Sequence, residues 1–363
     1  MLTFICTFKF DIIILNKMNN VDFAFIVHSR TAEDFKRKYR ILHWFPDAFI
    51  DFITLRLKPI LVSYIDGVKS LKSGDPINGV VIGIPMTAKQ LLENRSLALK
   101  RIIQSVEKAK KYGAKRIALG AMTASLSKGG IDVISSVENV YITNGRTFTS
   151  KNICDYVEYY TQLCNISKEN IRIGILGAAG SIGSSVTKTL IKLGYKNFTL
   201  IDLERKLDTL EKHLDSIRNI NNHIKINKGH QVRLLYECKI IIAATSSPEI
   251  VIRPSDVSYG TIIINDAQPS DVDPEIIRTR SDVTVVEGGV LHTDSVNCHF
   301  NFGLHHRTDI FSCLAEVILI SALNISEHKS ISELDHNYMK ELDIASRKLG
   351  FKICPQNING LVK

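Results

Sequence analysis

Cys313 is the residue in this sequence best placed to act as a nucleophile. A helix-like apolar segment covers residues 311–323, and Asp309 just before it has a side chain suited to cap a helix. Cys313 then falls in or near the first turn, where the helix dipole and the backbone N–H groups favour a thiolate. Because cysteine is also among the commonest core residues, the residues alone leave a structural role for Cys313 open.

Side chains that move protons lie on both sides of Cys313. His305 and His306 stand just upstream, where either could add positive charge or donate a proton. Glu316 follows Cys313 by three residues, so it shares a helix face and could orient a water or a proton donor. We therefore predict a catalytic group of Cys313, Glu316 and His306.

A second group of residues is typical of phosphate binding. A glycine-rich turn directly follows the apolar run 171–176 and opens the helix pattern 181–193. In this context the glycines permit a tight turn, a close approach of the backbone to a pyrophosphate, and close packing of helix on strand. The helix N-terminus then offers N–H groups and a positive dipole end. The expected contacts are Gly177, Gly180, Ser181, Ile182 and Gly183.

The residues that select the dinucleotide conflict with one another. Asp202 ends the next strand-like run, 25 residues after Gly177, where a carboxylate binds the ribose 2′-hydroxyl of NADH. Arg205 and Lys206 follow closely and suit the 2′-phosphate of NADPH instead. The spacing therefore leaves both cofactors open.

Histidines and cysteines gather at 292–306, but they do not follow a metal-binding pattern. The five residues are His292, Cys298, His299, His305 and His306. Their spacings match no common zinc motif, and loop histidines in solvent explain them as well. We expect no metal site.

Strand-like runs alternate with helix-like patterns along the chain, which favours an α/β fold with mostly parallel sheets. The runs are 19–29, 79–85, 116–122 and 139–143, then 171–176, 198–201, 239–244, 261–265 and 283–287. Pro85 is expected to end its strand. Thr87 and Gln90 have capping-box spacing before a helix that stops at Gly113. The last five runs have the cadence of a doubly wound dinucleotide-binding domain.

These patterns predict a substrate domain, a dinucleotide-binding domain and C-terminal helices that pack back on the first domain. The expected ranges are 1–20 as an extension outside the fold, 21–168 for the substrate domain, 169–296 for the dinucleotide-binding domain, and 297–363 for the helical segment with Cys313.

The composition indicates which classes of binding partner and which cellular compartment to expect. In 363 residues, Lys and Arg number 46 and Asp and Glu 37, so the net charge of +9 favours an anionic partner. No run of five basic residues occurs, so nucleic acid is not expected. The odd number of cysteines, at irregular spacings, favours a reducing cytoplasm over a disulfide framework. No apolar stretch reaches the roughly 18 residues of a transmembrane helix.

Seven segments, in order along the chain, resemble the aldehyde-forming long-chain acyl-[acyl-carrier-protein] reductases. They are 21–29 with 34–40, 79–92, 112–133, 176–186, 243–252, 280–290 and 301–320. The resemblance extends from about Val21 to at least Asn324. The chain departs from the family pattern at 144–147, Leu203, 305–306 and Val317.

The resemblance implies a substrate domain followed by an NADPH-binding Rossmann domain that includes Thr245 among its cofactor contacts. It further implies that Cys313 accepts an acyl group from a carrier thioester, and that hydride then releases an aldehyde. An acyl-carrier protein or acyl-coenzyme A is the implied donor. Arg37, Lys38 and Arg40 are the expected carrier contacts, and an aldehyde-consuming enzyme is a further expected partner.

Two other functions fit the same fold. One is a shikimate-dehydrogenase-like NAD(P)-dependent alcohol oxidoreductase, which uses a Lys and Asp pair in the first domain and no cysteine. The other is a cofactor-binding module without activity. Labelling of Cys313 by an acyl donor would distinguish the acyl-thioester reductase from both of these alternatives.

Overall fold

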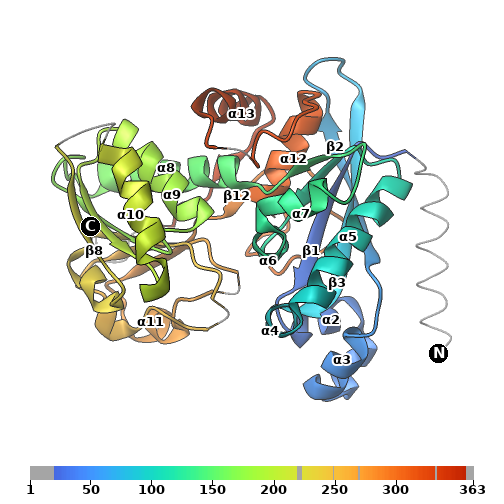
Figure 1. Ribbon diagram of the computed structural model, residues 1–363, viewed down its shortest axis with the longest axis horizontal. Coiled ribbons are helices and arrows are strands. Elements are labelled where there is room, and N and C mark those ends of the chain that lie inside the picture. The colour runs from blue at the N-terminus through green and yellow to red at the C-terminus, as the bar shows by residue number, and fades with distance from the viewer. Residues whose placement is uncertain (1–19, 219–222, 248, 269, 332, 357–363) are drawn as a thin grey trace. The chain divides into compact units, whose positions relative to one another are not determined.

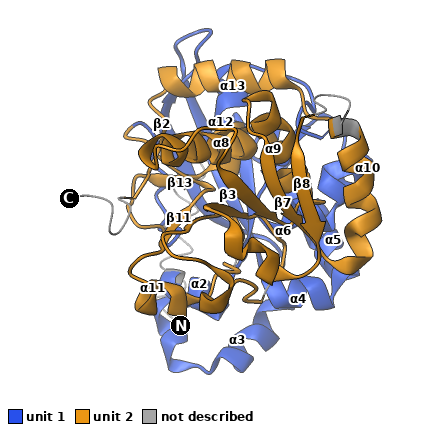
Figure 2. Cartoon of the chain, turned by 90° about the vertical axis from the view of Figure 1, so that its left-hand side faces the viewer, with its two compact units in different colours: residues 1–144, 295–303, 317–331 blue, residues 145–294, 304–316, 332–363 orange. Residues whose placement is uncertain are grey.

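A computed structural model describes residues 20–218, 223–247, 249–268, 270–331 and 333–356 (Figure 1). The expected extension 1–20 therefore lies, except for Asn20, outside the described residues. The chain forms two compact units, coloured separately in Figure 2. Unit 1 comprises the chain up to Asn144 with 295–303 and 317–331, and unit 2 comprises 145–294, 304–316 and 332–363.

Unit 1 is built on a five-stranded sheet of order β2-β3-β1-β4-β5, in which only the β2–β3 pair is antiparallel. The strands are β1 Phe23–Ser29, β2 Ile60–Lys69, β3 Pro76–Thr87, β4 Arg116–Leu119 and β5 Tyr141–Thr143. The helices are α2 Ala32–Lys38, η1 Arg40–Trp44, α3 Asp47–Thr54, α4 Ala88–Glu93, α5 Arg95–Lys111, α6 Met122–Leu126, η2 Lys128–Gly130 and α7 Ile131–Ile134. This arrangement confirms the expected α/β architecture.

Two local predictions for unit 1 have different outcomes. Thr87 and Gln90 form the expected capping box at the start of α4. The prediction that Pro85 ends a strand is wrong, because β3 continues to Thr87. The pairing of β1 with β3 shifts register at this point, from His28–Ile84 to Ser29–Thr87. Such an irregularity tolerates a proline that cannot donate a ladder hydrogen bond.

Unit 2 contains an all-parallel six-stranded sheet of order β11-β10-β9-β6-β7-β8. Its strands are β6 Arg172–Leu176, β7 Asn197–Ile201, β8 Lys225–Gly229, β9 Ile240–Ala243, β10 Ile262–Asn265 and β11 Thr284–Glu287. The strand order places the first and fourth strands side by side and reverses between them. That is the order of the doubly wound dinucleotide-binding fold.

The remaining elements of unit 2 are helices and a small second sheet. The helices are α8 Arg146–Leu163, α9 Ser181–Lys192, η3 Glu204–Lys206, α10 Leu207–Arg218, η4 Val232–Glu237, η5 Pro254–Asp256, α11 Pro274–Thr279 and α13 His336–Lys348. The small sheet has the order β13-β12-β14, from Val290–His292 (β12), Asp309–Phe311 (β13) and Lys352–Ile353 (β14). Helix α12, Ser312–Ala322, begins in unit 2 and continues into unit 1.

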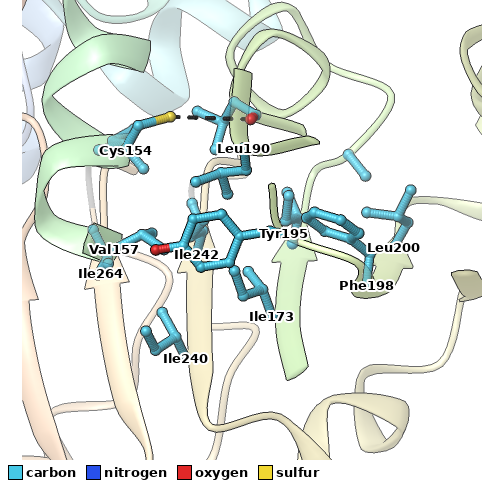
Figure 3. Close-up of a cluster of buried hydrophobic side chains, with 14 of the residues drawn as sticks. Cys154, Val157, Ile173, Leu190, Tyr195, Phe198, Leu200, Ile240, Ile242 and Ile264 are labelled. Carbon is cyan, nitrogen blue, oxygen red and sulfur yellow. Dashed lines mark hydrogen bonds between the residues drawn. The ribbon is translucent and has the colours of Figure 1, made fainter. Parts of the chain in front are cut away.

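The parallel sheet is covered on both faces, which explains its nearly continuous apolar strands. Ile240 and Ile242 face one core with residues of α8, α9 and α10, part of which Figure 3 shows. Ile241, between them, faces a second core with residues of η4 and α11. The exception is β8, Lys-Ile-Asn-Lys-Gly, a polar edge strand that its sequence does not reveal.

The chain divides at a different place from the expected boundary at residue 168. Ile153, Tyr156 and Tyr160 of α8 are buried in the core of unit 2, so this helix belongs with the parallel sheet. The C-terminal helix α13 also belongs to unit 2, where Asp343 pairs with Lys151 of α8. Of the C-terminal segment expected to pack on the first domain, 297–303 and 317–331 belong to unit 1, whereas 304–316 and α13 belong to unit 2, so the expectation is wrong for α13. No helix among the described residues is long and apolar enough to cross a membrane.

Candidate functional site

Cys313 is the second residue of α12 and is half-buried, so its thiol lies in the first helical turn as expected. The predicted capping residue is wrong. Asp309 belongs to strand β13, and its Oδ2 accepts the backbone N–H of His306 at 2.9 Å. The helix therefore begins directly at the end of a strand, and the strand fixes the direction in which α12 leaves.

The N-terminus of a second helix lies against Cys313. Gly145 is the N-cap of α8 and has a left-handed backbone with φ of +72°. A Cβ atom added to Gly145 would lie only 2.2 Å from the Cβ of Cys313, so no other residue fits there without displacement. The N-termini of two helices, α12 and α8, thus meet at Cys313. Both favour negative charge at that point.

Glu316 joins the two helices. Its side chain is fully buried, its Oε2 accepts the backbone N–H of Phe148 at 2.7 Å, and its Oε1 accepts from the Tyr338 hydroxyl at 3.5 Å. Burial lowers the pKa of the Arg146 guanidinium, and the nearby Glu316 carboxylate opposes that shift. Glu316 therefore caps α8 from α12, and its prediction as a residue that orients a water or a proton donor stays a prediction.

A second tether joins the same helices: Asn152 of α8 donates to the hydroxyl of Ser312 at 3.1 Å. With the Glu316 contact, it fixes α12 against α8 one residue before and three residues after the thiol.

Cys313 is connected to the carboxyl edge of the parallel sheet through Ser312 and Gly289. The backbone N–H of Ser312 donates to the carbonyl of Gly289 at 2.8 Å. A Cβ added to Gly289 would lie 2.4 Å from Oδ1 of Asp266, which directly follows β10. Ligands of doubly wound folds bind at this edge, beyond the carboxyl ends of the strands.

The same edge carries two carboxyl groups that the sequence analysis missed. Desolvation, reinforced by the carboxylates of Glu287 and Asp271, raises the pKa of Asp266 to about 8. Desolvation raises the pKa of the buried Asp271 to about 6, although the Thr245 hydroxyl donates to it at 2.8 Å. Asp266 is therefore mostly protonated at neutral pH. The only sequence signal was a polar Asn-Asp pair at the end of an apolar strand.

The glycine turn fits a dinucleotide pyrophosphate. Gly177 has φ of +83°, and an added Cβ would lie 2.5 Å from the carbonyl oxygen of Ala244. At Gly183 an added Cβ would lie 2.3 Å from the carbonyl of Gly177. At Gly180 the nearest atom is 3.0 Å away and the next 3.9 Å, so the missing side chain leaves an open cradle. Ser181 begins α9 directly after it, and Ile182 follows within the first turn.

Asp202 lies at the predicted strand end, but its carboxylate has an internal role. It is 6 % exposed, and its two oxygens accept the backbone N–H groups of Ala179 and Leu203, each at 2.8 Å. It therefore braces the glycine turn. Arg205 and Lys206 are exposed in η3 immediately afterwards, with Lys206 Nζ 3.7 Å from Asp202.

The two histidines predicted to assist Cys313 lie beside each other. The exposed ring of His306 lies against His305, with ring centroids 4.6 Å apart. Cys298 and His299 belong to unit 1, where His299 contacts Asp66, whereas His292 belongs to unit 2. The histidine and cysteine cluster of the sequence is therefore divided between the two units.

Comparison with known proteins gives distant relatives and no matching family model. The chain is 24% identical to the aminotransferase PigE of a Serratia species over 287 residues, which are 78% of this chain but 33% of that protein. It thus spans a third of that relative. It is 24% identical to the long-chain acyl-[acyl-carrier-protein] reductase of Synechococcus elongatus over 266 residues, 68% of this chain and 74% of that protein.

Among solved structures, quinate dehydrogenase from Corynebacterium glutamicum in complex with NAD is 10% identical, with a TM-score of 0.39, over 90% of this chain and 99% of that one. The order of the parallel sheet and the glycine turn, together with the distant similarity to a reductase, characterise the chain as a mixed α/β protein with a dinucleotide-binding fold of the dehydrogenase and reductase type.

Proposed function

We propose that this protein reduces an acyl thioester to an aldehyde through a covalent acyl-enzyme on Cys313, with NADPH as the reductant. One observation carries the proposal. Cys313 lies in a first helical turn against the N-terminus of α8, and Ser312 and Gly289 connect it to the carboxyl edge of the dinucleotide-binding sheet. The 24% identity to an acyl-[acyl-carrier-protein] reductase supports the same chemistry.

In the first step the Cys313 thiolate attacks the carbonyl carbon of the donor thioester. The bond to the carrier sulfur breaks, the carrier leaves as its thiol after taking up a proton, and the acyl group stays on Cys313 as a thioester. The N-termini of α12 and α8 stabilise the thiolate before attack, and the negative charge that develops on the carbonyl oxygen. Reduction of this acyl-enzyme releases the aldehyde and restores the thiolate.

The cofactor is held by the glycine turn and η3. Gly177, Gly180 and Gly183 shape the cradle for the pyrophosphate at the N-terminus of α9. Because Asp202 braces this turn with both oxygens, Arg205 and Lys206 are the side chains suited to a ribose phosphate, which favours NADPH. The reduced nicotinamide supplies a hydride when bound.

Two groups are candidates for the proton that the leaving carrier thiol needs. His306 is the candidate from the sequence, and its ring is exposed. Asp266 is the candidate from the structure, because it keeps its proton at neutral pH and lies against Gly289 near the start of α12. Glu316 acts indirectly, by fixing α8 against the helix of the nucleophile.

The charge of +9 suits an anionic acyl donor, either an acidic carrier protein or acyl-coenzyme A. Arg40 is exposed, and Arg37 is half-exposed beside Asp34, so both remain available to a carrier. A cytoplasmic location and transfer of the aldehyde to a consuming enzyme complete the proposal.

The decisive experiment is intact-mass measurement after incubation with long-chain acyl-coenzyme A or acyl-carrier protein, without reduced cofactor. We expect one acyl adduct per chain, absent in Cys313→Ser and retained in Cys164→Ser, a half-buried cysteine in unit 2. Addition of NADPH should remove the adduct and yield the aldehyde.

The alternative functions predict other outcomes. Turnover of an alcohol with NAD(P), unchanged in Cys313→Ser and without an adduct, identifies a non-covalent dehydrogenase. Cofactor binding without turnover of any donor identifies a binding module. Either result contradicts the proposal.

A further inference from the structure

The small sheet β13-β12-β14 brings three different metal-ligand side chains together. His292 ends β12, Asp309 begins β13, and Cys354 directly follows β14. One donor atom from each, a ring nitrogen, a carboxylate oxygen and a sulfur, lies within 4.8 Å of the other two. Asp309 is buried and the other two residues are half-buried, so the group is partly shielded from water.

The histidine and the carboxylate are each oriented by a second contact. Nδ1 of His292 faces Oδ1 of Asp309 at 3.2 Å, while its Nε2 faces Oδ1 of Asp294 at 3.2 Å. A metal-bound histidine typically donates its other ring N–H to a carboxylate, and Asp294 stands in that place. Oδ2 of Asp309 accepts the backbone N–H of His306, which leaves Oδ1 directed at His292.

The backbone of Cys354 is held in place by a buried tyrosine of the core. Its backbone N–H donates to the hydroxyl of the buried Tyr156 at 2.9 Å, and that hydroxyl donates to the carbonyl of Val290 at 3.1 Å. Burial, reinforced by the Asp309 carboxylate, raises the pKa of the Cys354 thiol to about 11. A divalent cation between sulfur and carboxylate would reverse this effect and stabilise the thiolate.

We propose that His292, Asp309 and Cys354 bind a zinc ion, with water as the fourth ligand. A set of one nitrogen, one oxygen and one sulfur suits Zn²⁺, which accepts all three donors in tetrahedral geometry. Bonds of about 2.0–2.3 Å imply donor separations of roughly 3.5 Å. The His292 and Asp309 donors already lie 3.2 Å apart. The sulfur therefore needs to move by roughly 1.3 Å at most.

The ion would join the C-terminal strand β14 to β13, the strand that leads directly into α12. The expected effect of the ion is to hold Cys354, after β14, close to Asp309, at the start of β13. None of the three ligands takes part in the proposed acyl transfer, so the zinc site stands independently of that function. It also explains why the histidine spacing matched no motif: Cys354 lies 45 residues after Asp309.

The experiment titrates Co²⁺, and then Zn²⁺, into the full chain after chelator treatment. Thiolate-bound Co²⁺ shows a sulfur-to-metal charge-transfer absorption, which reports the Cys354 ligand directly. We expect one Co²⁺ per chain with this absorption, its loss on addition of Zn²⁺, and a rise in melting temperature with Zn²⁺. Cys354→Ser should abolish the absorption and weaken binding by about 100-fold or more, since even outer-shell changes reduce affinity 10–100-fold.

Matched variants keep the test decisive. Cys164→Ser and Cys313→Ser should retain the absorption. Its loss in Cys313→Ser would show that Cys313, and not Cys354, supplies the metal-bound sulfur, which would contradict the proposal. If Cys354→Ser fails to fold, His292→Gln makes the same comparison at a half-exposed ligand. The proposal is overturned if micromolar Co²⁺ gives no charge-transfer absorption, or if Zn²⁺ raises the melting temperature of Cys354→Ser as much as that of the unaltered chain.

Discussion

The Glu316 carboxylate accepts the backbone N–H of Phe148 at 2.7 Å, which locks the helix of the candidate nucleophile to the N-terminus of α8. Because Phe148 is the third residue of α8, this side chain from another helix replaces the capping residue that Gly145 cannot provide. The arrangement keeps two positive helix ends directed toward one region.

We expect Glu316→Ala to reduce the free energy of unfolding by about 2–4 kcal/mol, because it leaves the buried N–H of Phe148 without its acceptor and removes a negative charge near the Arg146 guanidinium. Glu316→Gln keeps an oxygen that can accept the Phe148 N–H, so its free energy of unfolding should fall by less than that of Glu316→Ala. Urea denaturation measures both. Acyl-adduct formation on Cys313 should slow in both folded variants, and an unchanged adduct rate in Glu316→Ala would show that the lock is irrelevant to the thiol.

Gly145→Ala should displace Cys313 as well as strain the backbone. The added methyl carbon would lie 2.2 Å from Cys313 Cβ, in a residue with φ of +72°. Gly194→Ala is the matched control, since Gly194 has φ of +97° and no atom within 4 Å of the added carbon. We expect about 1 kcal/mol of destabilisation in the control and at least twice that in Gly145→Ala. Adduct formation should fall only in Gly145→Ala, and equal behaviour of the two variants would refute the contact.

Cofactor selection should depend on η3 rather than on Asp202. Arg205→Ala with Lys206→Ala should raise the Kd for NADPH by about tenfold or more, with little change for NADH, because the 2′-phosphate loses its charge partners. Lys212→Ala, an exposed lysine on α10, is the control.

Asp202→Ala should weaken both cofactors alike, since it releases the Ala179 N–H that shapes the glycine turn. Binding titrations followed by nicotinamide fluorescence measure each Kd. A selective loss of NADH affinity in Asp202→Ala would instead assign the carboxylate to the ribose.

The pH dependence of stability should report Asp266. Its folded-state pKa of about 8 lies above the unfolded value of about 3.9, so the native state keeps a proton that the unfolded state has released. The stability contributed by this group is therefore fully present below about pH 4 and is lost as the pH rises to about 8. As the pH rises through this window, the free energy of unfolding of Asp266→Asn should increase relative to that of the unaltered chain by at most about 1.4 kcal/mol per pH unit.

Asp282→Asn provides the comparison for that measurement. Hydrogen bonding to Arg280 lowers the pKa of Asp282 to about 2, so its variant should show a constant difference between about pH 5 and 8. Urea denaturation at several pH values measures both differences. A flat profile for Asp266→Asn would mean that Asp266 is ionised in the folded protein.

Local patterns in the sequence determined the elements whose signals are short in range. The capping box of Thr87 and Gln90, the glycine turn and the apolar strands of the parallel sheet all appear where the pattern predicts them. Each depends on residues within a few positions of one another, so hydrophobic periodicity and backbone sterics suffice. The edge strand β8 was not predicted, because a strand with a solvated edge needs no apolar pattern.

Only the tertiary structure decided which distant residues meet. The sequence singled out Cys313 as the candidate nucleophile. It could not show that Gly145 lies against Cys313, or that the Glu316 carboxylate caps the helix α8. The raised pKa of Asp266 and the approach of Cys354 to Asp309 likewise arise from burial and from contacts between separate strands. Desolvation and long-range packing depend on the whole fold, and no spacing along the chain encodes them.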